Sequence, residues 1–236
     1  MEMNSLIKDF IADITSESER DSHHHNFFGW KCTYVPEEII MAAGFVPYRI
    51  MGANIGIGKS KAYLQGSLNP YTQSCLECAL NGDYDFLKGI IIGNSDDASR
   101  RLFDVWQKYL KHAFVYLFDI PKISTEEAIM RYKLETESLI QRVENIFKVK
   151  ISENALRDAA KTLNITRGLL NSLNELRKSG SCSIKSNEFL EIMKLAMITP
   201  KELFNEKLKQ VLKEIKSQNS DKSNDCPRIL LTGSFQ

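Results

Sequence analysis

The sequence lacks the long apolar run and the strong net charge that mark membrane proteins and nucleic-acid-binding proteins. No apolar run reaches about 18 residues, so we expect no membrane-spanning helix. The net charge of +1 provides no broad field that would attract nucleic acid or an acidic membrane. The opening residues MEMNSLIKDFIADI are amphipathic and carry acids, unlike a secretory signal. We therefore expect a cytoplasmic protein that has neither nucleic acid nor membrane as a partner.

Cysteine is also scarce, and its spacing does not suggest disulfides. The five cysteines are Cys32, Cys75, Cys78, Cys182 and Cys226. An odd number without a disulfide-like spacing favours reduced thiols in a cytosolic setting. By contrast, 43% of the residues are apolar and 26% are charged, a balance that supports a packed core. A chain of 236 residues has room for one large domain or two small ones.

Residues 29–118 alternate between apolar strands and helices. The run at residues 29–49 shows the pattern, with a short strand, Pro36 in a first helical turn, and Gly44 as a helix stop before a second strand. Strands are expected at residues 29–34, 45–51, 89–92 and 113–118. Helices are expected near residues 36–43, 70–81 and 96–110. This order predicts an α/β fold with a doubly wound, mainly parallel sheet in residues 1–121.

The sequence becomes helical after residue 121. Long helices are expected at residues 125–147, 152–178, 186–197 and 200–217, and we interpret residues 122–217 as a helical subdomain. A polar linker follows at residues 217–227, and the apolar segment 228–234 runs into Gly and Ser as the first strand of a βα unit would. We expect residues 218–236 to be the start of a truncated second α/β domain. The alternative is that this strand docks on the first sheet.

Residues 53–60 (ANIGIGKS) satisfy a permissive phosphate-loop pattern. Such a loop holds phosphates with its amides and lysine at the start of a helix. Here Gly66 and Pro70 would cut that helix short, and Ala53 replaces the first glycine. We therefore interpret the segment as a flexible glycine-rich connection. A phosphate-loop nucleotidase is the alternative.

Cys75 and Cys78 form a CxxC pair, a pattern that occurs in redox sites and metal knuckles. The pair lies in the helix expected at residues 70–81, where both thiols would share one face. No second pair of cysteine or histidine lies at knuckle spacing in the sequence, and cysteine is a common small core residue. A structural role is therefore favoured. The three histidines at residues 23–25 are interpreted as part of a solvated loop.

Several segments together resemble one enzyme family. Residues 29–49 (GWKCTYVPEEIIMAAGFVPYR) resemble its opening βαβ unit, and residues 69–77 (NPYTQSCLE) resemble a segment usually written C-P-[FY]-x-x-S. Residues 84–106 resemble "yDfLdGvi" followed by "tCDs.rRl.DvW". Further resemblances lie at residues 119–121, 151–156, 163–177 and 227–234. In this order and spacing, the segments resemble the D-component subunits of the 2-hydroxyacyl-CoA dehydratase and benzoyl-CoA reductase family.

The resemblance implies a heterodimeric enzyme of anaerobic metabolism. In that family an ATP-dependent activator protein delivers one low-potential electron to a cysteine-bound 4Fe–4S cluster. The cluster and the acyl-CoA thioester together allow ketyl-radical chemistry. The result is loss of water from a 2-hydroxyacyl-CoA, a lyase reaction, or reduction of the ring of benzoyl-CoA. The implied partners are a cluster-bearing homologous subunit, the activator and an acyl-CoA substrate.

The sequence departs from the family at the positions that would bind the cluster. The cysteine of C-P-[FY] falls on Asn69 and the cysteine of t-C-D falls on Asp96, while the third family cysteine lies in the second α/β domain. Neither Asn nor Asp supplies a thiolate, so we expect this chain to bind no cluster. Replacement of the missing ligands by Cys75 or Cys78 is the alternative.

Glu38 matches the glutamate of the family's P-x-E segment. By resemblance it would be a catalytic residue facing the active-site cleft, near the thioester or the departing hydroxyl. The whole pattern favours a cluster-poor partner that contributes to the acyl-CoA site and is inactive by itself. The alternative is a degenerate, non-catalytic paralogue that acts as a binding or scaffold protein.

Overall fold

The structure is a computed structural model that describes residues 3–21, 26–179 and 184–217. Contacts among these residues define two compact units. The sheet unit is Asn26–Leu156, and the helical unit combines the N-terminal helix with the segments from Arg157 onward. The strand and linker predicted within residues 218–236 lie outside the described residues, as do Cys182, Cys226 and residues 23–25.

The sheet unit is built on four parallel strands in the order β2-β1-β3-β4. They are β1 (Phe27–Lys31), β2 (Val46–Arg49), β3 (Ile90–Asn94) and β4 (Val115–Asp119). In the pairing register, Gly29 lies opposite Ile90, and Ile90 lies opposite Val115. Parallel neighbours require crossover connections, which the intervening helices provide. The α/β fold with a parallel sheet that the sequence predicts is confirmed.

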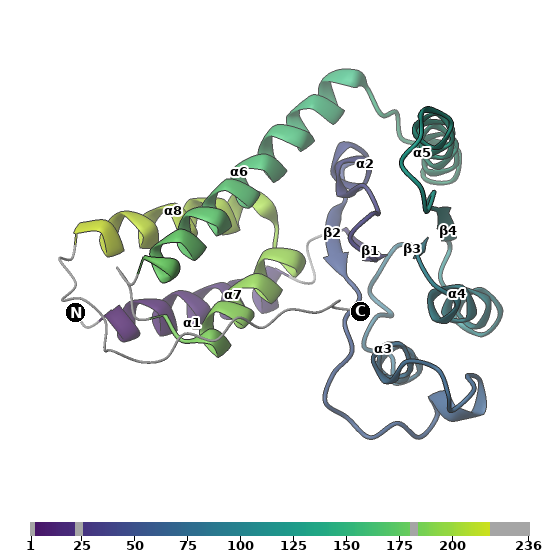
Figure 1. The fold of residues 1–236 in the computed structure, drawn as a ribbon, viewed down its shortest axis with the longest axis horizontal. Helices are drawn as coiled ribbons and strands as arrows, with labels where there is room; N and C mark the ends of the chain where they lie inside the picture. The colour runs from purple at the N-terminus through teal and green to yellow at the C-terminus, as the bar shows by residue number, and fades with distance from the viewer. Residues whose placement is uncertain (1–2, 22–25, 180–183, 218–236) are drawn as a thin grey trace. The chain divides into compact units, whose positions relative to one another are not determined.

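Helices cover both faces of this sheet, as a doubly wound fold requires. They are α2 (Glu37–Ala42), α3 (Pro70–Leu80), α4 (Asp97–Tyr109) and α5 (Glu126–Phe147), together with the short 3₁₀ helix η1 (Ser60–Ala62). Figure 1 shows α2 and α5 over one face and α3 and α4 over the other. Every residue of β1 is therefore buried, which explains why its sequence is an almost unbroken apolar run.

The two faces bury different side chains. Beneath α3 and α4, Leu76, Leu102 and Trp106 pack with Ile90 and Ile92 of β3 in one apolar cluster. All five side chains are fully buried. Alternate residues of β3 point to opposite faces, so this cluster takes the first and third residues of the strand.

Aromatic rings fill the opposite face. The ring of Phe28 lies 5.3 Å from that of Phe45 and 5.6 Å from those of Phe114 and Phe147, measured between centroids. A Cβ atom at Gly89 would lie 2.7 Å from the Phe28 ring, so only glycine allows this close approach. Because Phe147 is the last residue of α5, these contacts hold the end of that helix on the sheet.

The first strand ends earlier than residues 29–34, the range expected from the sequence. β1 runs from Phe27 to Lys31, and at Cys32 the backbone adopts a φ of 91°. This left-handed conformation is uncommon for a residue with a Cβ and ends the extended backbone. The chain turns there and enters α2 through Val35 and Pro36, so α2 starts close to its expected position.

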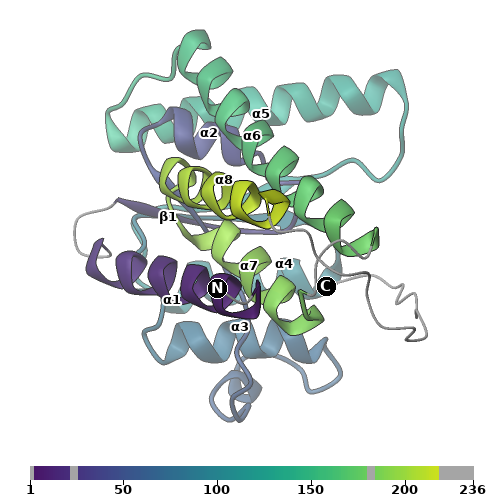
Figure 2. The same ribbon diagram turned by 90° about the vertical axis from the view of Figure 1, so that its left-hand side faces the viewer.

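The helical unit packs α1 (Met3–Asp21) against α7 (Ser186–Ile198) and α8 (Lys201–Ser217), together with most of α6 (Glu153–Lys178), as Figure 2 shows. Phe10, Leu173, Ile192, Phe204 and Leu208 are buried in its core. No described helix is both long and apolar enough to cross a bilayer.

This grouping differs from the ranges 1–121 and 122–217 expected from the sequence. The apolar residues of α1, including Ile7 and Phe10, are buried in the core shared with α7 and α8. In contrast, α5 contacts β4 and belongs to the sheet unit. Its residues Leu139 and Val143 are buried there. Helical sequence alone therefore does not tell which core a helix joins.

Candidate active site

The strand order of the sheet unit predicts where a ligand would bind. The chain passes from β1 to β2 on one side of β1 and then crosses to β3 on the other side. In open parallel sheets, ligands bind beyond the carboxyl ends of the strands at such a reversal. A ligand is therefore expected to bind near the residues that follow β1, β3 and β4.

A cavity of about 580 Å³ lies at this edge. Its lining comes from the segments that follow β1, β3 and β4 and from the first turns of α5. The lining residues are Tyr34, Asn94, Ser95, Ile120, Pro121, Lys122, Ile123, Ser124, Ala128, Ile129 and Tyr132. Sites for small molecules and cofactors have volumes of roughly 300–1,000 Å³ and combine apolar walls with a few polar groups. This cavity meets both conditions.

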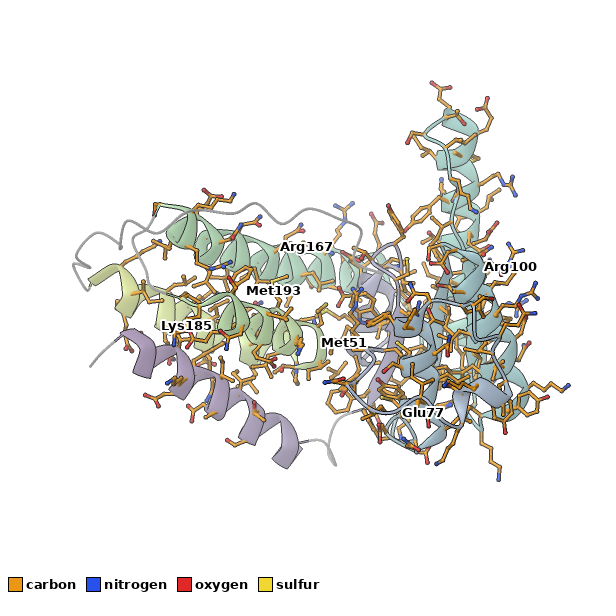
Figure 3. The ribbon with its side chains drawn as sticks, turned by 60° about the horizontal axis from the view of Figure 1, so that its bottom comes forward. Met51, Glu77, Arg100, Arg167, Lys185 and Met193 are labelled. Atoms are coloured by element: carbon orange, nitrogen blue, oxygen red, sulfur yellow. The ribbon has the colours of Figure 1, made fainter. Side chains whose placement is uncertain are left out.

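Hydrogen bonds fix the polar wall of the cavity. The Asn94 side-chain amide donates to Oδ1 of Asp119 at 2.9 Å, and its Oδ1 accepts from Nη2 of Arg100 at 3.3 Å. These contacts join the ends of β3 and β4 to α4, on which Figure 3 labels Arg100. Beside them, Ser95 Oγ donates to Asp96 Oδ2 at 3.3 Å.

Tyr132 forms part of the opposite wall. Its hydroxyl donates to the backbone oxygen of Tyr34 at 2.9 Å, and its ring packs edge-on against Phe118, 5.3 Å away. Burial raises the pKa of Tyr132, and electrostatic interactions with Glu38 and Cys32 raise it further. The phenol therefore remains protonated at neutral pH and able to donate a hydrogen bond.

Glu38 lies in the first turn of α2 and is half-buried. Its charge acts on Tyr132, which lines the cavity. Glu38 itself does not line the cavity. The structure thus places this residue close enough to Tyr132 for the two side chains to interact electrostatically, and its predicted catalytic role stays a prediction.

The two residues that replace the family's cluster cysteines both directly precede helices. Asn69 precedes α3, and its side-chain oxygen accepts a hydrogen bond from the Tyr71 amide at 2.8 Å. Asp96 precedes α4, and its Oδ1 accepts from the Ser99 amide at 2.6 Å. Asparagine and aspartate are among the best residues for this N-cap position. Both side chains therefore satisfy helix amides that would otherwise lack partners.

Asp96 also carries the charge that compensates a buried lysine. Lys31, at the end of β1, is only 8% exposed and donates to Ser99 Oγ at 3.0 Å. Burial pushes the pKa of Asp96 upward, but hydrogen bonds from Ser99 and the positive charge of Lys31 outweigh it, so its pKa is lowered. Asp96 is thus ionised at neutral pH, and its carboxylate accepts hydrogen bonds from other residues of the chain.

The glycine-rich segment 53–60 binds a carboxylate of the chain itself, that of Glu77. The carboxylate of Glu77 accepts from the amides of Gly58 and Lys59 at 3.0 Å and from the amide of Ser60 at 2.8 Å. Lys59 donates through Nζ to Asn81 Oδ1 at 2.7 Å. Figure 3 labels Glu77, which lies on α3. The loop is therefore tied to α3 rather than flexible, and its amides are not available to a phosphate.

Comparison with known proteins identifies the family. A family model described as 2-hydroxyglutaryl-CoA dehydratase, D-component, matches residues 32–235. The chain belongs to this family. The resemblance noted in the sequence is thereby confirmed.

Three curated relatives of the D-component chain are similar over most of its length. One of the benzoyl-CoA reductase subunits of Thauera aromatica is 29% identical over 205 residues, covering 86% of this chain and 53% of the relative. The beta subunit of (R)-phenyllactyl-CoA dehydratase from Clostridium sporogenes is 28% identical, with 85% and 54% covered. The beta subunit of (R)-2-hydroxyglutaryl-CoA dehydratase from Acidaminococcus fermentans is 27% identical, with 85% and 53% covered. The chain therefore spans about half the length of these relatives.

Within the part of the chain that the structure describes, the residues at the family's cluster positions do not fit a cysteine-held 4Fe–4S cluster. The oxygens of Asn69 and Asp96 cap helices, and neither residue supplies the soft thiolate that iron prefers. Cys75 and Cys78 are buried. Burial raises the pKa of the Cys75 thiol to about 12 and also raises that of Cys78. Within the described residues, no group of three His, Cys, Asp or Glu side chains is placed to bind a metal ion.

Sequence reasoning misses most of the cavity. Lys122, Ile129 and Tyr132 are single residues on a loop and a helix face, and they carry no local motif. The D-x-P segment at residues 119–121 is the available signal, since it follows an apolar strand directly. In a parallel sheet, residues that follow successive strands meet at one edge.

Proposed function

We propose that the chain is a subunit of a 2-hydroxyacyl-CoA dehydratase or benzoyl-CoA reductase-type complex, and that it is the cluster-poor partner in that complex. Membership of the D-component family and the names of the relatives support this assignment. The observation that carries it is the use of Asn69 and Asp96 as helix caps. A cluster would then belong to a homologous, cluster-bearing subunit.

The cavity of about 580 Å³ is the proposed contribution of this chain to the acyl-CoA site. Tyr132 keeps its proton and holds one wall by its bond to Tyr34. Glu38, which interacts electrostatically with Tyr132, would orient the thioester or the departing hydroxyl of a ligand. Electrons would reach the complex through an ATP-dependent activator protein acting on the cluster-bearing partner, so the isolated chain would be inactive.

The test is anaerobic co-expression of this chain with a candidate cluster-bearing homologous subunit. The complex, supplied with the activator, ATP and a reductant, should convert a 2-hydroxyacyl-CoA to the enoyl-CoA or reduce benzoyl-CoA. The partner without this chain should show much lower turnover. If the chain co-elutes with no partner and no acyl-CoA is converted, the proposal fails.

The second candidate is a non-catalytic paralogue that acts as a binding or scaffold protein. The same capped positions favour it, because both would lose any contribution to cluster binding. The co-expression experiment separates the two candidates. A complex that forms but turns over acyl-CoA no faster than the partner alone would support the scaffold.

A further inference from the structure

A buried network of hydrogen bonds begins at Lys31, the last residue of β1. Its Nζ donates to Ser99 Oγ at 3.0 Å, and Ser99 is fully buried in the first turn of α4. The backbone amide of Ser99 in turn donates to Asp96 Oδ1 at 2.6 Å. An ammonium group can only donate hydrogen bonds, so the Ser99 oxygen accepts here and its own hydrogen is directed to another acceptor.

Ser95 joins this network to the cavity. It lines the cavity and is half-buried, and its Oγ lies 3.3 Å from Asp96 Oδ2 and 3.4 Å from Ser99 Oγ. Although burial pushes the pKa of Asp96 upward, Ser99 and Lys31 hold it below its usual value. The ionised carboxylate can only accept hydrogen bonds, so the hydroxyl hydrogen of Ser95 is directed to Asp96.

The Ser95 oxygen is therefore an acceptor toward the cavity. A hydroxyl group has one hydrogen and two lone pairs, and the hydrogen of Ser95 is already bound. The Asn94 amide is bound within the chain at both ends, and Tyr132 donates its hydrogen to the backbone of Tyr34. Donation to a carboxylate polarises the Ser95 hydroxyl and makes its oxygen the stronger acceptor of the two hydroxyl groups.

We infer that Ser95 accepts a hydrogen bond from a hydroxyl group of the acyl chain, and that Asp96 orients it for this contact. The inference rests on the proposed function, in which the ligand is an acyl-CoA. Ser95 is then a residue that contacts the ligand, and Asp96 is a positioning residue. Because Asp96 replaces a cysteine of the family pattern, a chain that keeps the cysteine lacks the carboxylate that orients this serine.

The direct test is calorimetric titration of the purified chain with 2-hydroxypropionyl-CoA, 2-methoxypropionyl-CoA and propionyl-CoA. The methoxy compound keeps the oxygen but cannot donate, and propionyl-CoA lacks the oxygen without adding bulk. The hydroxy compound should bind about three- to tenfold more tightly than either of the others, the usual net effect of one hydrogen bond. The ratio of affinities is the readout, because general damage to the site would weaken all three compounds alike.

A matched pair of serine variants assigns the contact. Ser95→Ala removes the acceptor and should bring the three affinities to within about twofold of one another. Ser124→Ala makes the same change at an exposed serine that also lines the cavity, and it should leave the preference for the hydroxy compound unchanged.

Asp96→Asn tests the positioning role. Asparagine can still accept from the Ser99 amide and cap α4, so the helix keeps its first turn. Its amide nitrogen would then face Ser95 and donate to it, which frees the serine hydrogen for the ligand. The preference for the hydroxy over the methoxy compound should disappear or reverse. Asp104→Asn, at an exposed position of the same helix, should not change it.

Each other outcome overturns a specific statement. Equal binding of the hydroxy and methoxy compounds to the native chain would refute the acceptor role of Ser95 while leaving an acyl-CoA site in place. An equal loss of preference in Ser95→Ala and Ser124→Ala would refute the assignment to Ser95. Full preference in Asp96→Asn would refute the positioning role. Failure of all three compounds to bind would refute the acyl-CoA site itself, and with it that part of the proposed function.

Discussion

At the scale of single residues, two side chains determine what the cluster positions do in this chain. Asn69 and Asp96 each accept a backbone hydrogen bond at the first turn of a helix. Asparagine and aspartate oxygens satisfy these amides well, whereas a thiol accepts hydrogen bonds weakly. Each of the two residues thus stabilises the start of a helix and cannot supply a thiolate ligand.

Replacing Asp96 tests this role. Asp96→Ala should lower the free energy of unfolding by about 1 kcal/mol or more through loss of the cap. Buried Lys31 would also lose the nearby charge that compensates it. Urea denaturation at neutral pH gives the value. Asp104→Ala, at an exposed position of the same helix, is the control and should change the stability by less than about 0.5 kcal/mol.

The effect of Asp96 should depend on pH in a defined direction. Its folded pKa is lowered from 3.8, so the ionised form stabilises the fold above the unfolded pKa. This contribution is lost as the pH falls through the folded pKa. The difference in stability between the native chain and Asp96→Asn should therefore shrink in acid. A difference that stays constant as the pH is lowered would contradict the assignment.

Glu38 is the residue to change for activity. In the reconstituted complex, Glu38→Gln should lower kcat by roughly 10²-fold or more if its carboxylate takes part in proton transfer or orientation. The control is Glu127→Gln at an exposed position of α5. Steady-state rates of both variants, measured with unchanged partner and activator, provide the comparison. A Glu38→Gln rate within about twofold of the native rate would show that Glu38 takes no part in the reaction.

At the scale of elements, the sequence predicts helices better than strands. The expected ranges 70–81 and 96–110 agree closely with α3 (Pro70–Leu80) and α4 (Asp97–Tyr109). The structure adds that Asn69 and Asp96 cap these two helices. The predicted end of β1 is wrong because nothing in the sequence announces the left-handed backbone of Cys32. The prediction of a flexible loop at residues 53–60 is wrong. The loop is held by Glu77, which is distant in sequence and which no local pattern indicates as its partner.

Removal of the Glu77 charge should loosen that loop. Glu77→Gln should lower the free energy of unfolding by about 1–3 kcal/mol, because three backbone amides lose a charged acceptor. Chemical denaturation measures this change, and Glu137→Gln, at a half-exposed position of α5, is the control. Unchanged stability in Glu77→Gln would show that these bonds contribute little.

The contribution of Glu77 to stability should change with pH in the same direction as that of Asp96. Burial pushes its pKa upward, but hydrogen bonds from Ser60, Lys59 and Gly58 outweigh this effect and lower the pKa from 4.5. Its ionised form therefore stabilises the fold above the unfolded pKa, and the contribution is lost as the pH falls through the folded pKa. Glu77→Gln should accordingly differ least from the native chain in acid.

At the scale of the whole molecule, the sheet unit assembles a cavity from segments far apart in the sequence. Tyr34, Asn94 and Ile129 meet only because β1, β3 and β4 run in parallel and end at one edge. The alternation of strands and helices predicts that edge, whereas Glu38, the residue implied by the resemblance to the family, does not line the cavity and its role stays a prediction. Which residues meet across the cavity depends on strand order and on the packing of α5, and no local sequence pattern specifies either.

We propose that this chain binds no 4Fe–4S cluster, although it belongs to a family of iron–sulfur-dependent enzymes. The most direct measurement is iron and sulfide content per chain after anaerobic purification and reconstitution with iron and sulfide. If the chain binds no cluster, we expect well below one iron per chain and no restored brown colour. About four irons and four sulfides per chain would contradict it. Loss of that iron in Cys75→Ser or Cys78→Ser would assign the binding to those thiols.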